Sequence, residues 1–117
     1  MVVRLGIVED DSLLRLTLTD LLNGHDDLDV VSSSATGEDI VRHAARGNVD
    51  AALLDIHLGD GPTGFEIAGA LRSRVSGIGI VFLSSVKDPR LLGYRPESVP
   101  EGARYLLKSE AKSIDWL

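Results

Sequence analysis

The sequence contains no cysteine, and this absence excludes disulfide bonds, thiolate metal sites and thiol catalysis. It also fits a reducing compartment. Basic charge is scarce as well, because 12 Lys and Arg residues face 18 Asp and Glu residues and leave a formal net charge of −6. Binding to nucleic acid requires a basic face that neutralises phosphates. We therefore predict that this segment makes no direct contact with nucleic acid, whereas its clustered acids suit a divalent cation.

Long hydrophobic runs are also missing. No apolar stretch approaches the roughly 20 residues that span a bilayer, and the N-terminus has no signal-peptide pattern. The sequence therefore predicts no membrane association and a cytoplasmic location.

Proline is rare except in one segment, residues 86–102. Three of the four prolines, Pro89, Pro96 and Pro100, lie there. Pro96 would break a helix that runs through it. We expect a short or irregular fourth helix in this segment.

The 117 residues form one domain, 1–117, long enough to bury roughly two-thirds of the surface of the unfolded chain. Apolar stretches rich in β-branched residues predict strands, and apolar residues at helical spacing predict the helices between them. Thr36 is the expected N-cap of the second helix. The predicted strands cover residues 2–8, 29–35, 51–57, 78–84 and 103–108, and the predicted helices cover 12–23, 37–46 and 65–74.

Strands that alternate with helices indicate an α/β fold: a five-stranded parallel sheet, doubly wound, with helices on both faces. The second strand is more polar and is expected near an edge. Residues 113–117 are typical of the first turn of a fifth helix that the chain does not complete. We expect the full-length protein to continue beyond Leu117.

Polar residues stand where the apolar strands end. Asp55 terminates the run that begins at Ala51, Ser84 and Lys108 end the fourth and fifth strands, and Glu9 and Asp10 follow the first. The carboxyl ends of parallel strands are where such sheets bind ligands. For Asp55 alone, a helix-capping or turn role is the alternative. The repetition of the pattern favours a site.

Neighbouring carboxylates at this edge would repel one another and raise their own pKa values. A bound Mg²⁺ would relieve the repulsion, since this ion prefers oxygen ligands. Asp10 is the expected direct ligand and Glu9 the one acting at longer range. The alternative is that these acids only cap the following helix, for which Asp11 and Ser12 are the candidates.

A carboxylate beside Mg²⁺ can act as a nucleophile toward phosphorus. Phosphoryl transfer needs neutralisation of three equatorial oxygens. The cation, the Lys108 ammonium and the Ser84 hydroxyl could each serve one of them. Asp55 would then carry the phosphoryl group.

Four segments of the chain match the sequence pattern of a known family. The chain resembles the receiver domain of two-component response regulators over essentially its whole length. The matching segments are Ile7-Val-Glu-Asp-Asp11, Leu53-Leu-Asp-Ile-His57, Phe82-Leu-Ser-Ser85 and Gly102-Ala-Arg-Tyr-Leu-Leu-Lys108.

The resemblance implies a flavodoxin-like receiver fold and a domain that is not itself an enzyme. It implies that a sensor histidine kinase donates the phosphoryl group and that an output domain or effector protein responds, in transcriptional regulation. A homodimer is left open. The implied residues are Asp55 as phosphoacceptor, Glu9, Asp10, Asp55 and the His57 backbone carbonyl as Mg²⁺ ligands, Lys108 and Ser84 at the phosphoryl group, and Ser84 and Tyr105 in the switch.

Two alternatives remain. One is an aspartyl-phosphate phosphatase or phosphotransferase, disfavoured because its nucleophile would lie on the first strand. The other is a degenerate receiver that acts as a constitutive interaction module. Such a module would lack the acid pair or the lysine, and both are present, but the proline-rich segment 86–102 keeps this alternative open.

Overall fold

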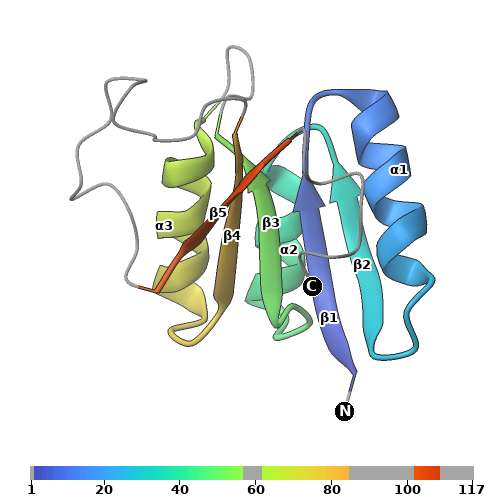
Figure 1. Ribbon diagram of the computed structural model, residues 1–117. Coiled ribbons are helices and arrows are strands. Elements are labelled where there is room, and N and C mark those ends of the chain that lie inside the picture. Colours follow the sequence, from blue (N-terminus) through green and yellow to red (C-terminus); the bar gives the residue numbers. More distant parts are fainter. Residues whose placement is uncertain (1, 57–61, 85–101, 109–117) are drawn as a thin grey trace.

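The molecule is built on one parallel β-sheet of five strands in the order β2-β1-β3-β4-β5 (Figure 1). The structure is a computed structural model, and it describes residues 2–56, 62–84 and 102–108. This architecture confirms the predicted fold class. In chain order the elements are β1 (Val3–Val8), α1 (Ser12–Asn23), β2 (Leu28–Ser34), α2 (Glu38–Ala45), β3 (Ala51–Asp55), α3 (Gly64–Arg74), β4 (Gly79–Ser84) and β5 (Arg104–Leu107).

Helices cover both faces of the sheet and create two separate cores (Figure 1). α1 packs on one face through Leu14, Leu18 and Leu22, whereas α2 and α3 pack on the other. Successive residues of a strand point to opposite faces. Leu53 and Leu54 on β3 accordingly belong to different cores, and both are buried. This double burial explains why the run before Asp55 is continuously apolar.

The helix starts show how far local sequence determines structure. Asp11 caps α1, since its carboxylate accepts hydrogen bonds from the amides of Leu13 and Leu14 at 3.0 and 3.2 Å. Thr63 and Glu66 form a reciprocal capping box at the start of α3. Asp11 was one of two residues predicted from the sequence as the first cap, and the capping box at the start of α3 was not predicted.

The prediction of Thr36 as the cap of α2 is wrong. The N-cap is Gly37, which makes no side-chain capping bond. A Cβ at this position would lie 2.7 Å from Cδ1 of Ile67 on α3. Helix packing, rather than capping chemistry, therefore selects the residue at this position.

Most element boundaries fall within one or two residues of the predicted ones, and β2 lies at the predicted edge. The expected irregular fourth helix in 86–102 and incomplete fifth helix in 113–117 lie outside the described residues. None of the helices in the described ranges is both long and apolar enough to cross a membrane.

Candidate functional site

The strand order brings the two acidic strand ends together. β1 and β3 are neighbours in the sheet, with Val8 opposite Leu54. Glu9 directly follows β1 and Asp55 is the last residue of β3, so the two acids lie side by side at the carboxyl edge. β4 and β5 continue the row beyond β3.

Lys108 reaches across this row from the end of β5. Its Nζ lies 3.0 Å from Oδ2 of Asp55 and 2.9 Å from Oε1 of Glu9. Its backbone amide donates to the carbonyl oxygen of Ser84 at 2.9 Å, which ties the end of β5 to β4. One ammonium group thus serves two carboxylates that are almost entirely shielded from solvent.

Glu9 is fully buried, and its hydrogen bonds are incomplete. Oε2 accepts from the amide of Asp11 at 3.1 Å and from Nζ of Lys108 at 3.3 Å. Oε1 is close to the same ammonium but not in hydrogen-bonding geometry, and it has no hydrogen-bond partner within the described ranges. A buried carboxylate oxygen in this state costs free energy unless another positive or donating group serves it.

Asp10 completes a group of three acids. Glu9, Asp10 and Asp55 each offer a carboxylate oxygen, and these oxygens lie within 4.8 Å of one another. Asp10 is exposed, whereas the other two are buried. Oxygen ligands beside solvent match the requirements of Mg²⁺, which usually keeps several waters. Together with the Glu9 oxygen that lacks a hydrogen-bond partner within the described ranges, this arrangement fits a divalent cation.

The pKa values of the three acids are shifted because their carboxylates lie close together and two of them are buried. Burial raises the pKa of Glu9 to about 7, and the neighbouring Asp55 adds to this rise. Burial also raises the pKa of Asp55, although Glu9 and Lys108 act against the rise. For Asp10, burial is outweighed by hydrogen bonds to Glu9 and Asp55, and its pKa is lowered. The site therefore favours retaining a proton when Lys108 is its only cation.

The pKa of Lys108 moves in the direction that suits this environment. Burial would lower it, but the hydrogen bonds with Glu9 and Asp55 outweigh burial, and the pKa is raised. The ammonium consequently stays charged beside the acids.

The other predicted residues lie on the same edge or on the sheet beside it. Ser84 is buried at the end of β4. Tyr105 pairs with Phe82 across β4 and β5, with ring centroids 5.4 Å apart, and 37% of Tyr105 is exposed. Phe82 in turn contacts Phe65 of α3 at 4.7 Å. His57 lies outside the described residues.

Two residues that the sequence analysis missed contact the acidic segments. Arg15 on α1 donates from Nη1 to the carbonyl oxygen of Glu9 at 2.7 Å. A Cβ added to Gly64, the first residue of α3, would lie 2.3 Å from the carbonyl oxygen of Asp55. The signal for Arg15 was its place one helical turn after Asp11. For Gly64, the sequence pattern indicated only a glycine in a loop.

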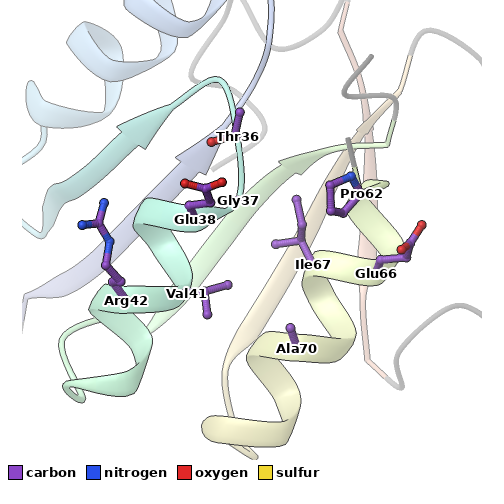
Figure 2. A pocket seen from close by; sticks show the side chains of 9 residues that line it. All are labelled: Thr36, Gly37, Glu38, Val41, Arg42, Pro62, Glu66, Ile67 and Ala70. Carbon is purple, nitrogen blue, oxygen red and sulfur yellow. The ribbon is translucent and has the colours of Figure 1, made fainter. Parts of the chain in front are cut away.

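A groove of about 800 Å³ lies between α2 and α3, apart from the acids (Figure 2). Val41 and Ile67 point toward each other across it, and Ala70 lies further along α3. None of the three clustered carboxylates lines this groove. The candidate chemistry therefore belongs to the edge of the sheet, not to the groove. The lining residues are Thr36, Gly37, Glu38, Val41, Arg42, Pro62, Glu66, Ile67 and Ala70.

Two solved structures of signal receiver domains superpose on this chain. The receiver domain of a modulated diguanylate cyclase from Desulfovibrio desulfuricans G20 superposes with a TM-score of 0.76 at 30% sequence identity, covering 96% of this chain and 86% of that one. The receiver domain of the putative response regulator NarL from Mycobacterium tuberculosis gives a TM-score of 0.75 at 24% identity, over 95% and 90% of the two chains. The second likeness concerns the fold alone.

The sequence matches the response regulator receiver domain family over residues 5–112, and the chain belongs to this family. Transcriptional regulatory protein DesR of Bacillus subtilis (strain 168) is 34% identical over 107 residues, which make up 91% of this chain and 51% of DesR. The DNA-binding transcriptional activator DevR/DosR of Mycobacterium tuberculosis (strain ATCC 25618 / H37Rv) is 31% identical over 83 residues, or 71% and 38% of the two chains. This chain therefore spans about half the length, or less, of these curated relatives.

Proposed function

We propose that Asp55 accepts a phosphoryl group from a sensor histidine kinase in a Mg²⁺-dependent reaction. The observation that carries this proposal is the placement of Asp55 between Lys108, at 3.0 Å, and the acids Glu9 and Asp10. A nucleophilic carboxylate, a fixed ammonium and a cation-binding acid pair are the parts that phosphoryl transfer to a carboxylate requires.

In the transfer, an Asp55 oxygen forms a bond to phosphorus while the P–N bond of the donor phosphohistidine breaks, and the imidazole leaves. Mg²⁺, held by Asp10, Asp55 and Glu9, would supply positive charge to the transferring group. Lys108 neutralises a second phosphoryl oxygen, since its ammonium already contacts the acceptor. The Ser84 hydroxyl donates a hydrogen bond to a third phosphoryl oxygen.

The phosphorylated domain switches an output domain or an effector protein, and transcriptional regulation is the role we propose. Support comes from the relatives, whose names describe transcriptional regulators and whose chains are nearly twice as long. We propose residues 1–117 as the receiver unit of such a regulator, acting in the cytoplasm. The acid group and Lys108 weigh against a degenerate module, which would lack one of them.

Incubation with acetyl phosphate and Mg²⁺ tests the proposal. Mass spectrometry should find one added phosphoryl group, released by hydroxylamine as expected for an acyl phosphate, and chelation of Mg²⁺ should prevent its addition. Asp55→Asn should remove the labelling. Full labelling of this variant at another residue would refute the assignment.

A further inference from the structure

The side chain of Arg15 turns back along α1 toward the segment that carries the acids. Its Nη1 donates to the carbonyl oxygen of Glu9 at 2.7 Å, in a partly buried position. Such a charge-assisted bond is among the stronger hydrogen bonds. Long helical side chains lean toward the helix N-terminus, which brings this guanidinium within reach of the preceding loop.

The position of the Arg15 charge is unfavourable for the stability of α1 itself. A positive charge near the N-terminus of a helix is unfavourable, because the macrodipole is positive there. Asp11 already caps α1, and no acidic residue occupies the first turn to offset the charge of Arg15. The contact with Glu9 therefore concerns the loop rather than the stability of α1.

The bonded carbonyl belongs to the peptide group that joins Glu9 to Asp10. A peptide group is planar, so fixing its oxygen also fixes the direction in which the Asp10 Cα leaves the strand. On the strand side, the amide of Glu9 is held by the carbonyl oxygen of Ser34 at 3.0 Å. On the helix side, the amide of Asp11 is held by Oε2 of Glu9 at 3.1 Å. Arg15 fixes the peptide between these two anchors.

We infer that Arg15 is a positioning residue that sets the orientation of Asp10 for the divalent cation. This inference rests on the proposed function, since it assigns Arg15 a part in the same site. Arg15 acts through the backbone of the acidic loop, by its bond to the carbonyl oxygen of Glu9.

The sign of the effect on Mg²⁺ affinity distinguishes positioning from simple charge. If Arg15 were only a nearby positive charge, its removal would strengthen Mg²⁺ binding, because like charges repel. If it positions Asp10, its removal weakens binding. Loss of groups that support metal ligands typically lowers affinity by 10–100-fold, and we expect about tenfold for Arg15→Met.

Isothermal titration of the 117-residue chain with MgCl₂ measures this directly, with circular dichroism to verify folding. Arg42→Met is the matched control, because it removes the same charge from an exposed side chain on α2 and should change affinity less than about twofold. Arg15→Lys keeps the charge and a donor on a differently shaped side chain, and its affinity should fall between those of the wild type and Arg15→Met.

Unchanged or tighter Mg²⁺ binding by Arg15→Met would overturn the inference while leaving the proposed function intact. If Arg15→Met does not fold, Arg15→Lys decides the question, and wild-type affinity in that variant overturns the inference. A wild-type chain that binds no Mg²⁺ would overturn the proposed function and this inference with it.

Discussion

At the scale of single residues, the site contains more carboxylate than one lysine can neutralise. Glu9 and Asp55 are buried and share the Lys108 ammonium, and Asp10 adds a third acid within 4.8 Å. Burial penalises the charged forms, and raised pKa values for Glu9 and Asp55 are the result. The two acids differ from Asp10 in exposure, and this difference leads to separate predictions for them.

The first prediction concerns Glu9 and pH in buffer that contains a chelator. Its pKa is about 7 in the folded chain, above the value of the unfolded chain. The folded state therefore binds more protons than the unfolded state between about pH 4.5 and 7, and its stability falls as pH rises through this window. Glu9→Gln removes this loss.

Urea denaturation should show that Glu9→Gln gains on the order of 3 kcal/mol over the wild type between pH 4.5 and pH 8, since each pKa unit corresponds to about 1.4 kcal/mol. Glu38→Gln, on the exposed surface of α2, is the control for removal of one negative charge. A constant difference between Glu9→Gln and the wild type over this range would contradict the raised pKa of Glu9.

The second prediction concerns Asp10 as the direct ligand. Asp10→Asn should weaken Mg²⁺ binding by at least about tenfold and slow labelling by acetyl phosphate. Asp11→Asn is the matched control, because it removes the same charge one residue later while asparagine still caps α1. Calorimetric titration with MgCl₂ compares the two variants, and equal losses would mean that overall charge, not ligation, controls affinity.

At the scale of elements, the start of α3 is pressed against the backbone of the acceptor residue. The amide of Gly64 donates to the carbonyl oxygen of Ile56 at 3.0 Å, and the position has no room for a side chain. α3 and the end of β3 therefore act as one unit. The start of α3 thereby contributes to the position of the Asp55 backbone.

The third prediction follows from this close approach. Gly64→Ala should force α3 away from Asp55, lower the free energy of unfolding by about 1–3 kcal/mol and slow phosphorylation. Gly69 lies in the same helix, and a Cβ added there would meet nothing within 4 Å. Gly69→Ala should therefore raise the free energy of unfolding by about 0.5–1 kcal/mol. Urea denaturation and labelling rates test both variants, and equal labelling rates in the two would contradict the coupling of α3 to Asp55.

At the scale of the whole molecule, the carboxyl edge of the sheet connects the site to β4 and β5. Lys108 links Asp55 to the end of β5, and its amide links β5 to Ser84. A phosphoryl group on Asp55 adds about −1.5 to −2 charges beside two donors, the Lys108 ammonium and the Ser84 hydroxyl. A nearly complete switch needs about 5.5 kcal/mol of differential stabilisation, and two charge-assisted hydrogen bonds of ~1.5–3 kcal/mol each approach it.

The fourth prediction is therefore a local tightening of the sheet on activation. With Mg²⁺ and the phosphoryl mimic beryllofluoride, amide hydrogen exchange should slow at Ser84 and along β5. Exchange in α2 should stay unaltered, because α2 packs mainly against β1, β2 and α3 rather than against β4 and β5. Unchanged exchange in β5 despite occupancy at Asp55 would indicate binding without switching and would favour the constitutive-module alternative.

The class of fold and most of the candidate residues could be predicted from local patterns in the chain. Alternation of apolar strands with amphipathic helices is a local property, and it required the parallel sheet with helices on both faces. Asp55 could be singled out because a carboxylate cannot lie cheaply within a strand buried on both faces. The Asp11 cap was also visible, since capping acts over three residues.

Only the tertiary structure decided the contacts between distant segments. The bond from Lys108 to Asp55 depends on strand order, and the bond from Arg15 to Glu9 depends on the direction of a side chain after α1 has packed. At the start of α2, Gly37 rather than Thr36 is the N-cap, and a side chain at position 37 would meet Ile67 of another helix. Such contacts are set by packing between elements, and no local pattern in the chain encodes them.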